Sequence, residues 1–102
     1  MSTVALAHDL GIEAAGALKQ HLALHLDQSG PLRVDASQVA RVHTAAIQVL
    51  CAFVLARRQT GQDTIFDQAT QTLRDAARLL GAAQVMGLET ISNESTFVEN
   101  AA

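Results

Sequence analysis

Cysteine, proline and aromatic residues are scarce in this chain of 102 residues, which has one Cys, one Pro, three Phe and neither Trp nor Tyr. Because Cys51 is alone, an internal disulfide and a cysteine-based metal cluster are excluded. No apolar run reaches the roughly 18 residues that a spanning helix needs, so we expect no insertion into a membrane. The N-terminus, Met1–Leu6, has no cationic leader before its apolar residues. The sequence therefore predicts a cytoplasmic protein without a signal peptide.

Charge is also scarce, at 17% of the residues, and the net charge is −3. Phosphate binding needs a basic surface, so this balance argues against a nucleic-acid partner. The hydrophobic fraction of 49% excludes a disordered chain and suffices for one domain with one core. We place that single domain at residues 1–88. Residues 89–102 contain Glu89, Glu94 and Glu99 and little periodicity, which predicts an acidic, loosely ordered tail.

Apolar patterns predict strands that alternate with helices. Short apolar runs bounded by turn residues indicate strands, and apolar residues that recur every three or four positions indicate helices. The predicted strands are Val4–Ala7, Leu32–Asp35, Val39–Val42 and Thr64–Phe66. The predicted helices are Ile12–Leu26, a long helix that ends before Gly61, a helix from a cap at Asp67 or Thr70 to Leu80, and a turn at Ala82–Met86. This alternation predicts an α/β fold, in which helices pack against a small mixed sheet of about four strands.

The long helix dominates the chain because it is unusually apolar. Between Ala45 and Ala56 its only polar side chain is Gln48. A helix of this kind is a central core element, a partner-binding surface, or both. We expect Thr44 to be its N-cap, since a hydroxyl there can accept from the backbone N–H groups of the first turn.

The same helix has two faces when residues are placed at roughly 100° intervals. One face, which we assign to the sheet, holds Ile47, Leu50, Cys51 and Val54. The opposite face is small and nearly uncharged, which suits close docking of another protein. That face holds Ala45, Gln48, Val49, Ala52 and Ala56. The alternative is that alanine occurs there only because it is a good helix former.

Polar residues near the start of the long helix raise the alternative of an enzymatic site. Asp35 and Ser37 form a D-x-S pair after a predicted strand, where their side chains can satisfy loose backbone N–H groups. A set of Thr44, His43 and Asp35 as nucleophile, base and orienter is the enzymatic alternative. Adjacent residues on a strand-to-helix turn usually point apart, so we predict no catalytic residue and no enzyme.

A second polar pair, His21 and His25, has the four-residue helical spacing that can hold a metal. No carboxylate or cysteine is evidently paired with these histidines. We therefore predict a solvated helix edge, with neither a metal site nor a cofactor.

The segment from Val34 to Leu50, V-D-A-S-Q-V-A-R-V-H-T-A-A-I-Q-V-L, resembles the STAS domain, which is named for sulphate transporters and anti-sigma factor antagonists. The family pattern is a strand, D-x-S, a short apolar run, and D-[ST]-[SAT]-G-L-x-x-L at the start of a helix. Downstream, R-R-Q-T-G before a strand and the apolar run Leu73–Leu80 before Gly81 also fit. The likeness covers roughly residues 3–88, and the extra N-terminal strand common in the family is mostly absent.

Two departures from the STAS pattern lie at the start of the helix. His43 replaces the family's Asp, and Ala46 replaces its Gly. The serine that is phosphorylated in anti-sigma factor antagonists corresponds to Ala45, which has no hydroxyl, so only Thr44 retains one. This variant is more similar to the STAS proteins of lipid-transport ABC transporters and of chemosensory gene clusters.

The resemblance implies a non-enzymatic regulatory protein that binds another protein. The implied partner is an anti-sigma factor or kinase-like switch protein, or a chemosensory protein, with Thr44 as the candidate phosphorylation site. The alternative is an accessory subunit that binds the ATPase of a lipid-transport ABC transporter. A homodimer through the small-residue face stays open. The residues that the resemblance and the helix pattern assign to partner binding are Asp35, Ser37, His43, Thr44, Ala45, Gln48, Val49 and Ala52.

Overall fold

The structure, a computed structural model, describes residues 2–88. Its strands are β1 (Ser2–Ala5), β2 (Asp9–Leu10), β3 (Leu32–Asp35), β4 (Arg41–Val42) and β5 (Thr64–Asp67). A 3₁₀ turn and four helices complete the described part: η1 (Ile12–Ala14), α1 (Ala15–Ala23), α2 (Thr44–Gln59), α3 (Gln71–Leu79) and α4 (Ala83–Met86). The predicted acidic tail lies outside the described residues, and its expected looseness stays a prediction.

The α/β class with helices against a small sheet is confirmed. Strands β1, β3 and β5 form a three-stranded sheet in the order β1-β3-β5, and β2 pairs with β4 in a separate ladder. Every pairing among residues 2–88 is parallel. The expected mixed sheet of about four strands is thus divided into two parallel sets. Strand β2 was not predicted, because two residues are too few to show a period.

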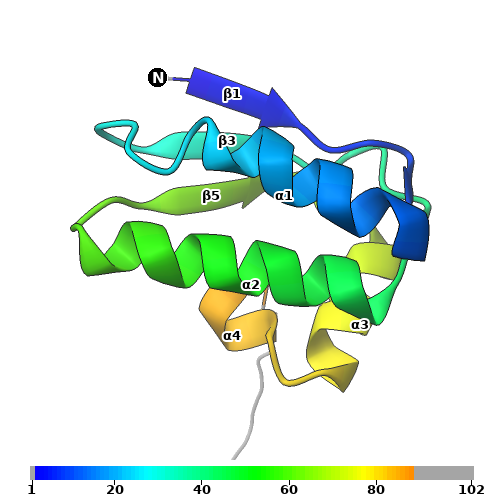
Figure 1. The fold of residues 1–102 in the computed structure, drawn as a ribbon. Helices are drawn as coiled ribbons and strands as arrows, with labels where there is room; N and C mark the ends of the chain where they lie inside the picture. The colour runs from blue at the N-terminus through cyan, green and yellow to red at the C-terminus, as the bar shows by residue number, and fades with distance from the viewer. Residues whose placement is uncertain (1, 89–102) are drawn as a thin grey trace, which may run out of the picture.

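Helices α1 and α2 lie side by side across one face of the three-stranded sheet (Figure 1). Helices α3 and α4 contact the other flank of α2. Because parallel strands return through crossover helices, the carboxyl ends of the strands and the first turn of α2 lie at the same end of the molecule (Figure 1). The polar residues that the sequence singled out for partner binding lie at this end: Asp35 ends β3, Ser37 and His43 lie in loops, and Thr44 and Gln48 lie in the first two turns of α2.

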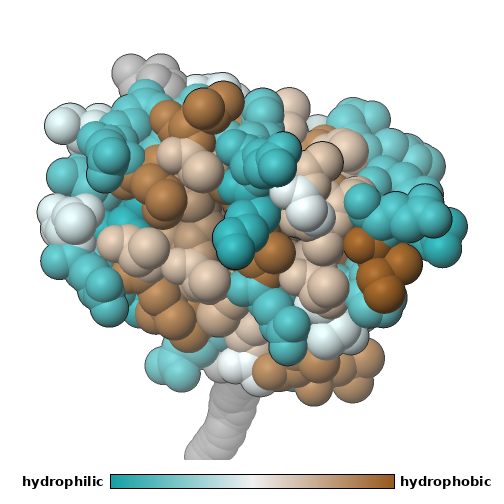
Figure 2. Space-filling model, in the orientation of Figure 1, coloured by the Kyte–Doolittle hydropathy of each residue, from teal (hydrophilic) through white to brown (hydrophobic). Residues whose placement is uncertain are grey.

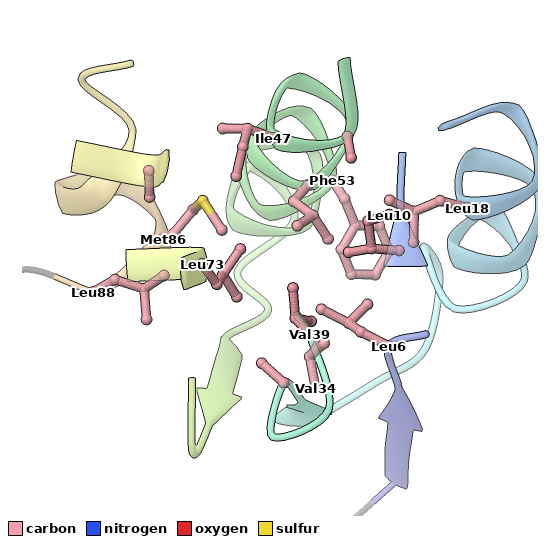
Figure 3. Close-up of a cluster of buried hydrophobic side chains, with 14 of the residues drawn as sticks. Leu6, Leu10, Leu18, Val34, Val39, Ile47, Phe53, Leu73, Met86 and Leu88 are labelled. Carbon is pink, nitrogen blue, oxygen red and sulfur yellow. The ribbon is translucent and has the colours of Figure 1, made fainter. Parts of the chain in front are cut away.

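One hydrophobic core joins these layers. Val34 and Leu6 from the sheet region lie opposite Ile47 and Phe53 of α2, and Met86 of α4 closes one side (Figure 3). Strand residues alternate as a one-sided sheet requires: in β3 the side chains of Leu32 and Val34 are buried, whereas the next ones along are half-exposed. Each such buried side chain contributes roughly 1.5–3 kcal/mol relative to exposure.

A buried arginine fastens the far end of α2. The Arg57 side chain is fully buried, and its Nε donates to the Thr64 hydroxyl at 2.9 Å. Its two terminal nitrogens donate to four backbone carbonyls, those of His25, Gln28, Gly30 and Asp63, at 2.8–3.0 Å. Burial lowers the pKa of this guanidinium, and the nearby Asp63 charge opposes that effect. The cation remains, because arginine does not lose its proton in proteins.

Arg57 therefore performs a task that the sequence did not indicate. Its position in the last turn of α2 indicates by itself only a favourable interaction with the helix dipole. In the structure it joins the turns after α1 to the loop before β5. It adds a side-chain donor to the His25 and Asp63 carbonyls, which also accept from backbone N–H groups. The helix dipole contribution applies equally to Arg58, whose side chain is exposed and reaches the Val85 carbonyl at 3.1 Å.

Candidate functional site

The first turn of α2 is capped by a histidine. His43 has extended backbone angles, φ −97° and ψ 154°, and its N–H donates to the Leu10 carbonyl at 2.8 Å. Its Nδ1 accepts a hydrogen bond from the Ala45 N–H at 3.0 Å. A ring nitrogen can accept only when it carries no proton, so this geometry assigns a neutral imidazole with its proton on Nε2. A neutral ring also suits the positive end of the helix.

The predicted cap at Thr44 is therefore wrong by one residue. Because the backbone of His43 is held extended by Leu10 of the neighbouring ladder, the helical angles begin only at Thr44. Thr44 becomes the first helical residue, and its side chain is exposed. Within the described part of the chain its hydroxyl makes no hydrogen bond, so it is free to react or to contact a partner.

The predicted D-x-S turn is confirmed. Asp35 Oδ1 accepts from the Ser37 N–H at 3.0 Å and from the Ser37 hydroxyl at 2.7 Å. Hydrogen bonds from the Ser37 hydroxyl and then from its backbone stabilise the charged form and lower the pKa of Asp35. The Leu6 N–H donates to the Asp35 carbonyl, and the Ala36 N–H donates to the Asp67 carbonyl, both at 2.9 Å. The turn is thus fixed between the ends of β1 and β5.

These two loops lie at the same end of the molecule but are not joined as a catalytic set. Within residues 2–88 no hydrogen bond links Asp35 to His43 or Thr44, since Asp35 is engaged by Ser37 and the His43 acceptor by Ala45. The arrangement has neither a base on the hydroxyl nor an orienter on the base.

The predicted histidine pair lies on α1 and in the turn after it. The His21 and His25 rings are 5.9 Å apart between centroids, and His25 Nδ1 is hydrogen-bonded to Gln28. Among the described residues there is no group of three or more His, Cys, Asp or Glu side chains placed to hold a metal ion.

The inward face of α2 agrees with the predicted face at three of four positions. Ile47, Leu50 and Val54 are buried, with 4% exposure or less. Cys51 is only half-buried, because the buried face is turned further, toward Ala46, Phe53 and Arg57. The predicted outward residues differ in exposure: Gln48, Ala52 and Ala56 are exposed, while Ala45 and Val49 are half-buried.

The outward residues of α2 line an apolar groove of about 580 Å³ that runs between α1 and α2. We call it the α1–α2 groove. The wall opposite α2 consists of Ala15, Gly16, Lys19, Leu22 and Ala23 of α1 and Leu26 of the turn after it. Lys19 is the one charged residue among those that line it. Figure 2 shows apolar residues gathered over these two helices, with polar residues around them. The structure brings Ala45, Gln48, Val49 and Ala52 together on this surface.

The family is identified by a model described as "Mlab, STAS domain", which matches residues 1–90. The chain belongs to the STAS domain family. A solved structure of "the Anti-Sigma Factor Antagonist SpoIIAA in its Unphosphorylated Form" superposes with a TM-score of 0.68 over 97% of this chain and 79% of that chain. The identity is 9%, so this likeness concerns the fold. No curated protein sequence matches the chain significantly.

The departures of this STAS chain from the family pattern have visible structural consequences. His43, at the place of the family's Asp, retains the capping function of an acceptor side chain through its ring nitrogen. Ala46, at the place of the family's Gly, is fully buried and has ordinary helical surroundings. The N–H of Ala45 is occupied by the cap, and its methyl group offers nothing to phosphorylate.

Two residues near the STAS site were missed by the sequence analysis. Lys19 was not singled out, since nothing in its own helix signals the α1–α2 groove. Gln68 follows β5 in a left-handed conformation, φ 54°, which costs a non-glycine residue free energy. It adjoins the Asp35–Ser37 turn, because the carbonyl of the preceding Asp67 accepts from Ala36. No local sequence signal marks this strained position.

Proposed function

We propose that this STAS protein is a non-enzymatic regulator of the cytoplasm that acts by binding another protein. The proposed contact surface consists of Asp35, Ser37, His43, Thr44, Ala45, Gln48, Val49 and Ala52. The observation that carries this proposal is the outward face of α2. It is uncharged, it is solvent-accessible, and it continues into an apolar groove, whereas the inward face of the same helix is completely used by the core.

The class of partner follows from the family. An anti-sigma factor or kinase-like switch protein, or a chemosensory protein, is the partner that a fold similar to an anti-sigma factor antagonist supports. The second candidate is the ATPase of a lipid-transport ABC transporter. It is favoured by the His43-Thr44-Ala45 variant, which resembles STAS proteins of such transporters, and by a family model that is described with the word Mlab.

Thr44 is the proposed regulatory residue of this surface. Its hydroxyl is exposed at the positive end of α2, where a phosphate is electrostatically favoured. The nearest competing hydroxyls are occupied, because that of Ser37 donates to Asp35 and that of Thr60 donates to the Arg57 carbonyl. A switch kinase that modifies the protein should therefore label Thr44 within residues 37–60.

Fragment mass spectra after incubation with a candidate kinase test this assignment. A phosphate at Thr44 that disappears in Thr44→Val supports it. A phosphate on Ser37 or Thr60 would move the regulatory site elsewhere. If the protein stays unmodified but still binds the transporter ATPase, the second candidate function is favoured.

The binding surface itself is tested by charges placed on the two faces of α2. Ala52→Arg should leave the fold intact and abolish capture of the partner, because Ala52 is exposed in the groove. Val49→Glu should do the same with a modest loss of stability, since Val49 is half-buried. Leu50→Glu and Val54→Glu should destabilise the fold by several kcal/mol, on the order expected for an unpaired core charge.

The readouts are circular dichroism, the thermal midpoint and co-purification with a co-expressed switch kinase, chemosensory protein or transporter ATPase. Thr3→Arg is a matched control, because Thr3 is exposed on the sheet and lies outside the proposed surface. If Ala52→Arg folds and still binds every partner that the unmodified chain binds, the proposed surface is wrong. Loss of binding in Thr3→Arg would move the interface to the sheet.

A further inference from the structure

The α1–α2 groove is open to solvent among residues 2–88, and it is nearly all apolar. Half-buried Val49 and Leu26 stand on opposite walls, and buried Phe53 and Leu22 form the floor. Lys19 places one positive charge beside these apolar walls. An apolar groove with a single cation is complementary to a segment that combines apolar side chains with carboxylates and has no cation of its own.

The chain itself contains such a segment. Residues 1–88 have seven acidic and seven basic side chains, so the whole net charge of −3 comes from the three glutamates of residues 89–102. That segment has no Lys or Arg. It also contains the apolar residues Ile91, Phe97 and Val98. Phe97 is one of only three phenylalanines in the protein.

The start of this segment lies within reach of the groove. Leu88 is buried, its N–H donates to the Ala83 carbonyl at 2.8 Å, and its carbonyl accepts from Arg74 at 3.3 Å. Leu88 is therefore a fixed point beside α4, on one flank of α2, and α1 lies on the other flank (Figure 1). The groove lies between α1 and α2, so it is on that other flank. A helix with its side chains is about 10–12 Å wide. Nine extended residues, from Leu88 to Phe97, span about 30 Å.

We propose that residues 89–102 dock in the α1–α2 groove of their own chain. Phe97 and Val98 contact its apolar walls, and a glutamate of the segment lies beside Lys19. The groove shares Ala45, Gln48, Val49 and Ala52 with the proposed partner surface, so the docked segment competes with the partner. This competition rests on the proposed function, whereas the docking itself does not.

Disulfide capture in the full chain tests the docking without any partner. In a Cys51→Ala background, Thr96→Cys, which leaves Phe97 and Val98 in place, is combined with Ala23→Cys, which lies in the groove, or with Ala17→Cys as the matched control. Both alanines are exposed on α1, but Ala17 does not line the groove. A docked segment raises the local concentration at position 23, so its intramolecular disulfide should form about tenfold faster than that at position 17.

The charge contribution is tested in the same assay. Lys19→Glu should reduce the rate at position 23 several-fold, and Lys19→Arg should restore it. Equal rates at positions 23 and 17 would overturn the proposal. Disulfides that join positions 23 and 96 of different molecules would also overturn it and would identify a second copy as the occupant.

The competition has a separate readout. In the full chain, Phe97→Ser with Val98→Ser should increase the affinity for the partner several-fold, because the groove is vacated. If disulfide capture succeeds but this double variant binds the partner as the unmodified chain does, the segment docks but does not compete with the partner, and the proposed partner surface is wrong. If disulfide capture shows no preference for position 23 and the double variant also binds the partner as the unmodified chain does, docking is disproved.

Discussion

The two ends of α2 are held in opposite ways. At the C-terminal end, a fully buried guanidinium donates to four carbonyls and one hydroxyl. At the N-terminal end, one imidazole nitrogen accepts from one backbone N–H, and His43 and Thr44 themselves are exposed. The C-terminal end is therefore anchored by a buried side chain, whereas the capping residues at the N-terminal end lie on the surface.

This difference shows how a small domain can offer a rigid binding surface. The exposed first turn of α2 needs few contacts of its own, because the inward face and the far end of the helix already fix its position. The exposed side chains of His43 and Thr44 can then contact a partner or be modified without disturbing the fold. The comparison predicts that replacement of Arg57 lowers the free energy of unfolding much more than replacement of His43.

The largest effect is expected for Arg57→Ala. It removes the hydrogen bonds from a fully buried side chain to four carbonyls and to the Thr64 hydroxyl, and we expect a loss of about 3–5 kcal/mol in the free energy of unfolding. Arg57→Lys should be intermediate, because an ammonium group has three donors and cannot reproduce the planar fork. Urea unfolding followed by circular dichroism measures both.

Arg58→Ala is the matched control for the buried arginine. Arg58 is the next residue of the same helix turn, it is exposed, and it makes one hydrogen bond to the Val85 carbonyl. Its replacement should cost well under about 1 kcal/mol, since exposed interactions contribute little. Similar losses for the two arginines would show that the two ends of α2 are not held differently.

A smaller effect is expected at the other end. His43→Ala removes the cap acceptor and should cost about 1 kcal/mol, whereas His43→Asn should retain most of the stability because Asn is a good N-cap. Thr44→Ala should change stability by only a few tenths of a kcal/mol, since its hydroxyl caps nothing. Urea midpoints rank the three variants, and a larger loss for Thr44→Ala than for His43→Ala would return the cap to Thr44.

The placement of this cap explains what the sequence could not predict. Both His43 and Thr44 have acceptor side chains, and the local pattern favours threonine. The choice is made by a tertiary contact, the hydrogen bond from the His43 N–H to Leu10, which extends the strand by one residue. Leu10 belongs to β2, the strand that the sequence analysis missed. The missed strand therefore also explains why the cap was expected at Thr44 and not at His43.

The elements with apolar patterns of their own were predicted well, because such patterns are local. Strand β3 and helix α2 carry their own periodicity, so the burial of Val34, Leu50 and Val54 follows from local sequence. Arg57 and the α1–α2 groove depend on residues far away in the chain. The carbonyls that Arg57 binds are up to 32 residues distant, and half of the groove belongs to α1. Such features appear only when the fold is assembled.

The smallest expected effect is the pH dependence of the Asp35–Ser37 turn. Its hydrogen bonds lower the folded-state pKa of Asp35 below that of the unfolded chain, so the charged form stabilises the folded protein. This contribution is present at pH values above the unfolded pKa, about 4 for Asp, and is lost as the pH falls through the lower folded pKa. Asp35→Asn, which retains an acceptor oxygen, should therefore be less stable than the unmodified chain at neutral pH and equally stable at strongly acidic pH.

The pKa of Asp35 can be followed directly by NMR of its carboxyl carbon. Removal of the stronger of the two hydrogen bonds in Ser37→Ala should move the pKa back toward the ordinary value, and Ser37→Thr should retain the depression because its hydroxyl can still donate. Since Asp35 is part of the proposed contact surface, a bound partner that covers the turn should change this titration as well. An Asp35 pKa that is identical in the unmodified chain and in Ser37→Ala would mean that the turn is not formed in solution, and that this edge of the proposed surface is less ordered than the capped start of α2.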